Sequence, residues 1–309
     1  MVKSDSAIAI PIRGSIAAFN CIATFMKISL AIGLGLLSTS IIAQAQDPTP
    51  PLWEAGLLGG FASTPSYPAA TDRATRAIVL PYLIYRGEVL RADRDGIGAR
   101  VVHTDDVEFD IGFAASLPSR ATDNAARIGM TDLGTLLEFG PRLKWTLARP
   151  SAASRLRVEL PLRGVLEFNS GVNAQGVVFE PELIYETRDV AAGWGFSASG
   201  SLVWGDRRLN NFFYGVAPQF STALRPTYEA QAGLIASRLS LSTSRHFGDD
   251  LRLFAFVRFE SYAGAANQGS PLHLQSSGSS LGLALAWTLG RSEQRAQNQA
   301  MMHINSQRK

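Results

Sequence analysis

Apolar residues recur at every second position along residues 53–289 of the chain. In residues 133–147 the odd positions are mostly aliphatic or aromatic, and most even positions are charged, hydroxylated or glycine. The same alternation returns in residues 155–168, 177–188 and 281–289. A period of two is that of a β-strand with one apolar and one polar face. Because helical periodicity is scarce over the same residues, the pattern predicts an all-β protein.

Three further features favour a membrane barrel over a soluble sandwich. Several alternating runs reach a dozen residues or more, whereas globular strands usually have about five or six. Charges gather on one face of consecutive strands while the other face stays free of them, as expected for a polar lumen and a lipid-facing exterior. Aromatic residues lie near the predicted strand ends, where interfacial girdles form. These aromatics are Trp53, Tyr82, Tyr85, Trp145, Trp194, Trp204 and Trp287.

Short and long connections alternate along the chain, as in outer-membrane barrels. The predicted short connections are 86–88, 103–106, 149–154, 189–192 and 247–250, and the long ones are 62–74, 118–131, 169–175, 205–227 and 263–279. A tight reversal at Arg94–Gly96 serves as a further outer turn. We therefore expect a transmembrane antiparallel up-and-down β-barrel of about twelve strands, with ten as the alternative, and both termini in the periplasm.

Two segments depart from the simple alternation. The apolar parity changes after Ala236, which predicts a β-bulge near Ser237–Arg238. Farther along, Phe254 and Phe256 share the parity of charged neighbours, so their rings are expected to fill part of the lumen.

The N-terminal region has the layout of a secretory signal peptide. Lys27 precedes the apolar run 28–42, and Ala43–Ala45 is a small-residue cleavage site. The run is shorter than the ~20 apolar residues of a membrane-spanning helix. We assign 1–45 to the signal peptide, with Met26 as an alternative start.

The remaining chain is divided by composition. Residues 46–51 form a short proline-rich leader in the periplasm, and 52–290 form the barrel. Residues 291–309 are polar and lack alternation, so they are predicted to be a disordered periplasmic tail.

Charge and cysteine content exclude several classes of function. Lys3, Arg13 and Lys27 against Asp5 supply two of the three net positive charges, so no basic surface indicates nucleic-acid binding. Cys21, the single cysteine, lies in the predicted signal peptide. A mature chain without cysteine has no disulfide, thiolate zinc site or cysteine nucleophile.

No residue pattern indicates catalysis. The histidines are His103, His246, His273 and His303. None has the spacing of a metal-ligand motif or belongs to a nucleophile elbow. We therefore expect neither an enzyme nor a metal or cofactor site, and an enzyme acting on lipid is the weakest alternative.

Charged residues on the polar face of 133–168 form a predicted lumen charge ladder. Its members are Glu138, Arg142, Glu159 and Arg163. If Thr146 faces Arg155 across the short turn, Arg142 faces Glu159 and Glu138 faces Arg163. Such pairs stabilise strand pairing by about 0.2–1 kcal/mol each. We favour a salt-bridged filling that narrows the pore over a selectivity lining.

Several segments resemble the MipA/OmpV family of MltA-interacting outer-membrane proteins. The strongest match is the hairpin that begins at Leu80, and a second is the loop around residues 211–216. The family-motif positions are Pro81, Tyr82, Tyr85, Arg86, Gly87, Arg91, Asp93, Gly96, Tyr214, Gly215, Val216 and Tyr228. The combination extends over Trp53–Leu289, although the polar residues after Leu289 depart from barrels that end on an aromatic residue.

The resemblance implies a monomeric barrel in the outer membrane, in contact with its lipid. It further implies a scaffold that binds murein-remodelling enzymes, a lytic transglycosylase and a murein synthase, at the periplasmic face. A narrow pore or permeability factor and a surface adhesin are the alternatives. The family offers no catalytic residues to transfer.

Overall fold

The computed structural model describes residues 50–87, 90–93, 96–190 and 193–296. The chain divides into two units, Met1–Asp47 and Pro48–Lys309, and every described residue belongs to the second. The predicted signal peptide, most of the predicted leader and the end of the predicted tail lie outside the described residues.

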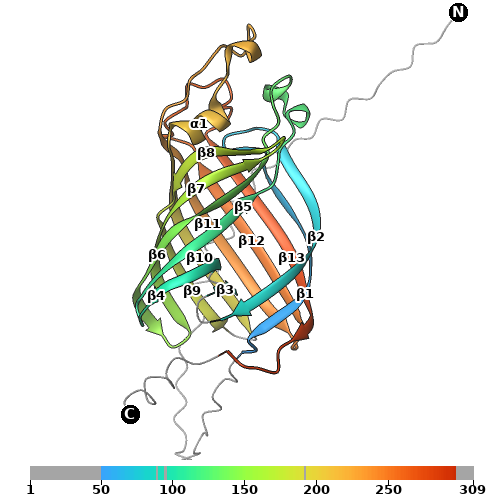
Figure 1. The fold of residues 1–309 in the computed structure, drawn as a ribbon, viewed down its shortest axis with the longest axis vertical. Helices are drawn as coiled ribbons and strands as arrows, with labels where there is room; N and C mark the ends of the chain where they lie inside the picture. Colours follow the sequence, from blue (N-terminus) through green and yellow to red (C-terminus); the bar gives the residue numbers. More distant parts are fainter. Residues whose placement is uncertain (1–49, 88–89, 94–95, 191–192, 297–309) are drawn as a thin grey trace, which may run out of the picture. The chain divides into compact units, whose positions relative to one another are not determined.

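The described residues form thirteen β-strands in one antiparallel sheet (Figure 1). They are β1 (Trp53–Pro65), β2 (Arg73–Arg86), β3 (Leu90–Asp93), β4 (Gly96–His103), β5 (Val107–Ser116), β6 (Thr135–Ser151), β7 (Ser154–Phe168), β8 (Val172–Phe179), β9 (Glu182–Val190), β10 (Trp194–Gly205), β11 (Gly233–Phe247), β12 (Leu251–Ser261) and β13 (Ser277–Arg291). Pairing passes between sequence neighbours and returns from β13 to β1, so it follows a closed circuit. This confirms the predicted antiparallel up-and-down barrel.

β8 and β9 share one position in the wall. Both pair with β7 on one side and β10 on the other, and the register on β7 continues without a shift from Phe179 to Glu182. The break falls at Glu180–Pro181, where proline has no N–H to donate to the ladder. The wall therefore has twelve positions, in agreement with the expected strand number.

The connections follow the predicted alternation, with one exception. Short turns at one end, which we call the turn end, join β4 to β5, β6 to β7 and β11 to β12. Long loops at the other end, the loop end, join β1 to β2, β5 to β6, β10 to β11 and β12 to β13. The predicted long connection 169–175 is wrong, because β8 already begins at Val172 and leaves only residues 169–171 between the strands.

Outward side chains form the expected apolar band. Trp53, Trp145 and Trp287 are exposed on its turn-end border, and Arg245 lies over the Trp194 ring at 5.2 Å from its centroid. Tyr82 departs from the predicted girdle. Its hydroxyl is 2.6 Å from Thr288 Oγ1, and it lines a cavity inside the barrel.

Two local irregularities were predicted. The pairing of β10 with β11 skips Ile235, so the bulge lies two residues before the predicted Ser237–Arg238. Phe254 and Phe256 do face the lumen, where they line a cavity. Gly282 pairs with Phe256, and the Phe256 ring fills the space that a Cβ at Gly282 would need.

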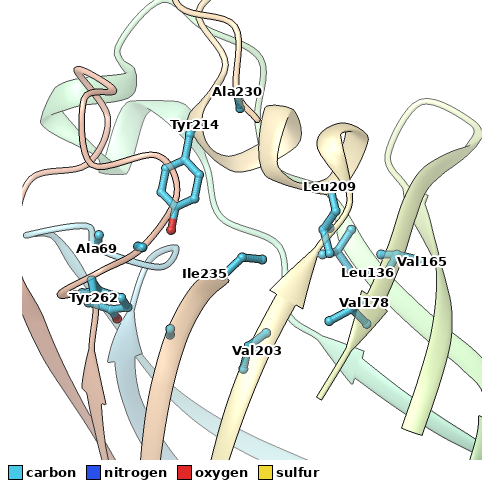
Figure 2. Packing of buried hydrophobic residues seen from close by; sticks show 12 residues of the cluster. Ala69, Leu136, Val165, Val178, Val203, Leu209, Tyr214, Ala230, Ile235 and Tyr262 are labelled. Carbon is cyan, nitrogen blue, oxygen red and sulfur yellow. The ribbon is translucent and has the colours of Figure 1, made fainter. Parts of the chain in front are cut away.

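Loops at the loop end fold over the barrel mouth as a structure that we call the cap. It consists of residues 66–72, 117–134, 206–232 and 262–276, with the short helices η1 (Ala121–Asp123), η2 (Ala125–Arg127), α1 (Arg207–Tyr214) and η3 (Pro218–Phe220). The Asp206 carboxylate caps α1 by accepting from the Leu209 N–H at 2.8 Å. Figure 2 shows the cap residues Tyr214 and Leu209 above barrel residues such as Ile235 and Val203, in one buried cluster.

Ordered structure continues beyond residue 290, where the barrel was predicted to end and the tail to begin. Arg291 still belongs to β13, and Ser292 N donates to the Trp53 carbonyl at 2.9 Å. Ala296 N likewise donates to Pro50 O at 2.9 Å. Ser292 is thus hydrogen bonded to the first residue of β1, and Ala296 to the leader.

Candidate functional site

Two ion-pair networks lie in the lumen. The network nearer the turn end connects β5, β6, β7 and β9. Lys144 Nζ lies 2.9 Å from Glu108 and 3.0 Å from Asp110, and Arg142 contacts Asp110 at 2.7 Å. Arg142 also lies 3.6 Å from Glu159, which extends the network to β7. The charged groups are largely buried and each has an opposite partner, as burial of charge requires.

The second network is centred on Glu180, at the break between β8 and β9. Its carboxylate accepts from Arg163 at 2.8 Å and from Arg238 at 2.7 Å. Arg163 also contacts Glu138 at 2.8 Å, and Arg238 contacts Glu260 at 2.7 Å. Residues from β6, β7, β11 and β12 are thereby linked through Glu180 along the lumen wall just below the cap.

The predicted ladder pairs are present, but not in the predicted register. Thr146 faces Arg157 and not Arg155, because β6 is irregular on both sides of Ala148, near the turn. The Arg142–Glu159 and Arg163–Glu138 pairs consequently form diagonally across the strands. Diagonal neighbours in a sheet remain within reach of long side chains.

The inward positions of β13 and of the middle of β1 and β2 are small or apolar, between Arg76 nearer the loop end and the Arg86–Glu54 pair at the turn end. On β1, Leu58 pairs with Leu80 of β2, and Leu58 lines a cavity inside the barrel. The inward positions of β13 include Gly282, Ala284 and Ala286, which alternate with exposed leucines. The lumen therefore carries ion pairs on β5–β9, β11 and β12, and small or apolar residues on β13 and along the middle of β1 and β2.

The cap closes the loop end through hydrogen bonds between different loops. Tyr67 Oη donates to Leu272 O at 3.0 Å, and Ser270 Oγ donates to Tyr214 O at 2.7 Å. The fully buried Asn267 donates to Asn210 Oδ1 at 2.9 Å. Burial raises the pKa of the Tyr67 phenol to about 12, so it remains a hydrogen-bond donor at neutral pH.

Beneath the cap is a cavity of about 370 Å³. The cap contributes Tyr67, Phe212 and Phe213 to its lining, and the lumen contributes Arg238, Arg258 and Glu260. The charged residues reach it from β11 and β12, which hold them on the inward face. This volume lies within the range of small-molecule sites, about 300–1,000 Å³.

A second cavity, of about 200 Å³, lies at the turn end. Two of the family-motif residues, Tyr82 and Arg86, line it together with Glu54, Asp249 and Asp250. Arg86 pairs with Glu54 at 2.7 Å and donates to Pro51 O at 2.9 Å. This cavity therefore has positively and negatively charged side chains in its lining, next to the hydrogen-bonded leader and tail residues.

The remaining motif positions fall in two separate places. Pro81 and Tyr85 face outward on β2, and the backbone of Arg91 pairs with Arg86. Asp93 and Gly96 pair with each other at the predicted reversal, of which residues 94–95 lie outside the described residues, and Gly87 follows β2.

The second group of motif positions belongs to the cap. Tyr214 ends α1, and Gly215 N donates to Asn211 O at 2.9 Å. Val216 exchanges backbone hydrogen bonds with Tyr228, whose hydroxyl donates to Asn267 at 3.2 Å. The motif thus marks the turn-end hairpin and the cap, and these do not form one site.

Sequence reasoning missed the centre of the second network. The alternation assigned no partner to Glu180, Arg238 or Glu260, although Arg238 and Glu260 are a cross-strand pair of the β11–β12 hairpin. Among the described residues, no group of three or more His, Cys, Asp or Glu side chains could hold a metal ion. No described helix is long and apolar enough to cross a membrane.

The apolar outer band, the amphipathic lumen and the alternating turns and loops define a membrane β-barrel. The family described as "MltA-interacting protein MipA" matches residues 57–289. The chain therefore belongs to the MipA family, which confirms the resemblance found in the sequence. It is an outer-membrane β-barrel protein.

No curated protein matches the sequence. Among solved structures, the chain is similar to "Bacterial polysaccharide outer membrane secretin", with a TM-score of 0.39, 7% identity, and coverage of 77% of this chain and 99% of that one. It is also similar to "CymD monoaromatic hydrocarbon channel" (TM-score 0.30, 10% identity, 80% and 90% coverage). A third is OpdO of Pseudomonas aeruginosa (TM-score 0.25, 10% identity, 77% and 96% coverage). These likenesses are weak, and the family assignment rests on the sequence match.

Proposed function

We propose that this protein is an outer-membrane scaffold that holds murein-remodelling enzymes at its turn end, in the periplasm. The observation that supports it best is the turn-end cavity, because two family-motif residues, Tyr82 and Arg86, line it beside the leader. Outer-membrane barrels place their short turns in the periplasm, where murein enzymes act. The family name points to one partner, a lytic transglycosylase of the MltA type. A murein synthase is proposed as the second.

The filled lumen favours a scaffold over a wide channel. The Glu180 network follows the lumen wall from β6 to β12 below the cap, and the cap loops are joined over the barrel mouth. We further propose that residues 1–45 are a signal peptide removed on export, that the barrel acts as a monomer in contact with outer-membrane lipid, and that it carries no catalytic site.

A co-purification assay tests the scaffold. The folded protein, solubilised in detergent, is immobilised and offered a purified MltA-type transglycosylase and, separately, a bifunctional murein synthase. Arg86→Gln breaks the Glu54 pair and the Pro51 contact, and we expect it to reduce retention of the transglycosylase by about tenfold. The matched control is Arg225→Gln in the cap, where the arginine donates to Ala126 O at 2.7 Å. Equal retention by both variants would contradict turn-end docking.

A narrow pore is the second candidate, because a cavity of about 400 Å³ lies in the lumen between β9, β10, β11 and β12. Single-channel recording in planar bilayers distinguishes the two functions. A scaffold with a filled lumen gives little conductance. Robust conductance whose ion selectivity changes in Arg163→Glu, with the barrel still folded, would instead favour the pore.

A further inference from the structure

The barrel wall has an opening between β2 and β5. β2 pairs with β1 along its whole length, but with β3 only at Tyr85 and Arg86. Within the described residues, no strand pairs with this edge of β2 over Arg73–Pro81. β5 pairs with β4 as far as Phe113, so its last residues also lack a described partner on that side.

The opening is bridged near the loop end. The Arg76 guanidinium, on β2, donates to the Pro118 carbonyl just after β5. Ala125 N, in the cap, donates to the Asp72 carboxylate at 2.9 Å. These contacts close the top of the opening, while the short β3–β4 hairpin forms its base, so the gap is a window in the side of the barrel.

The window leads into the cavity beneath the cap. Ala74 and Arg76 of β2 and Ala115 and Ser116 of β5 line that cavity, although the two strands do not pair. Residues from both edges of the opening therefore share one space with the lumen. Access to the cavity is lateral, because the cap covers it from the loop end.

The backbone groups along the edge of β2 at the window lack a described strand partner, and this costs free energy in a membrane. Unpaired backbone N–H and C=O groups have no water to bond in the hydrocarbon layer. Val79 is 75% exposed on the outer side of this edge, which places apolar side chains around the unpaired groups. A molecule with both polar and apolar parts would satisfy such a surface.

The charges around the cavity leave an excess of cations. Glu260 pairs with Arg238, and Glu138 with Arg163. Arg258 donates to Ser240 Oγ at 3.2 Å, and Arg76 to a carbonyl. Among the described residues, neither Arg258 nor Arg76 has a carboxylate within ion-pair distance. The net positive charge of these side chains therefore favours binding of an anionic group in the cavity.

The position of Arg76 suits a lipid-like ligand. Arg76 pairs with Ala62, one step beyond Phe61 of the outward apolar band, so it lies near the loop-end border of that band. Phe212, Phe213 and Leu133 supply apolar surface within the cavity. An anionic group at this level would reach arginine while its apolar chain remained among apolar side chains.

We propose that the window and cavity bind an anionic amphiphile, a carboxylate or phosphate group on an acyl chain, which enters laterally from the membrane. The head lies between Arg76 and Arg258, and the chain passes the Val79 edge of β2. This binding site is separate from the turn-end surface of the proposed scaffold.

Photolabelling tests the proposal on the folded full-length protein in neutral phosphatidylcholine vesicles. One probe is a photoactivatable fatty-acid carboxylate, a second is a lysophosphatidic acid with the same group, and an alkylamine of equal chain length is the cationic comparison. We expect either anionic probe to label peptides that contain Leu133 or residues 207–214. Which anionic probe labels more strongly distinguishes a fatty acid from a phospholipid as the source. The alkylamine should label only outward strand surfaces.

Charge variants give the sharper result. Arg76→Gln combined with Arg258→Gln should lower labelling of the cavity by about tenfold or more. Arg245→Gln removes the same charge from an outward residue at the turn end and should leave labelling unchanged. If the double variant fails to fold, Ser116→Trp fills the cavity from an exposed lining position and should abolish the same labelling. Labelling restricted to outward surfaces, or equal for anionic and cationic probes, would overturn the proposal.

Discussion

Replacing Glu180 by glutamine tests whether the second ion-pair network holds the barrel together. The change keeps the size of the side chain and removes its charge. Glu180 accepts from Arg163 at 2.8 Å and from Arg238 at 2.7 Å, and its side chain is 18% exposed. Both arginines remain inside the barrel after the substitution.

The expected loss of unfolding free energy depends on which carboxylate partners each arginine keeps after the substitution. An uncompensated buried charge typically costs about 3–5 kcal/mol when its partner is removed. Here Arg163 keeps Glu138 and Arg238 keeps Glu260, so neither arginine is left alone. Two charge-assisted hydrogen bonds are weakened, each worth about 1.5–3 kcal/mol. We therefore expect Glu180→Gln to lower the free energy of unfolding by about 2–4 kcal/mol.

Urea unfolding in lipid vesicles, followed by tryptophan fluorescence and by heat-modifiable gel mobility, measures the change. Glu229→Gln is the matched control, because Glu229 pairs with Arg207 at 2.8 Å on the exposed surface of the cap. Exposed pairs contribute about 0–1 kcal/mol. Equal losses below about 1 kcal/mol in both variants would refute the view that the network stabilises the fold.

Three further predictions concern the loop end. Gly176 has φ +103°, and a Cβ there would overlap the Asp206 carboxylate that caps α1, so Gly176→Ala should destabilise the fold by about 1–3 kcal/mol in the same urea assay. Tyr67→Phe removes the bond to Leu272 O and should cost about 1 kcal/mol, seen as faster proteolysis of the cap. Burial lowers the pKa of His273, so protonation favours the open cap as pH falls below about 6.5. Proteolysis should accelerate over that window in the natural chain and not in His273→Gln.

The wall was predictable because a membrane barrel imposes one constraint on every strand. Each residue faces either lipid or lumen, so the period of two marks the strands and its interruptions mark the connections. The split at Glu180–Pro181 escaped prediction, although Pro181 was the available signal. Period and parity continue across it, and only the missing N–H separates β8 from β9.

The register and the networks were less predictable. A two-residue change at the irregular end of β6 moved Thr146 from Arg155 to Arg157, and no alternation pattern records such a change. Arg238 and Glu260 are directly paired on the neighbouring strands β11 and β12, and Glu180 contacts Arg238 past the intervening strand β10. The Glu180–Arg238 contact joins residues 58 positions apart on strands that do not pair, and the alternation along one strand does not record it.

The cap was the least predictable part, because its segments show neither the two-residue period of a strand nor the 3.6-residue period of a long helix. Burial there depends on contacts between loops, such as Asn267 with Asn210, that are 57 positions apart. The capping residue Asp206 before an amphipathic run was the one local signal for α1, within the predicted loop 205–227.

The two proposed surfaces lie on the same strand, and this makes their independence testable. β2 carries Arg86 at the turn end and Arg76 nearer the loop end, and β1 pairs with both regions without a shift. If the surfaces act separately, Arg86→Gln reduces enzyme retention but not photolabelling, and the Arg76 and Arg258 variant does the reverse. If either variant changed both readouts, β2 would have to transmit the effect. Such transmission is feasible because, among the described residues, β1 is the only strand that pairs with β2 over Arg73–Pro81.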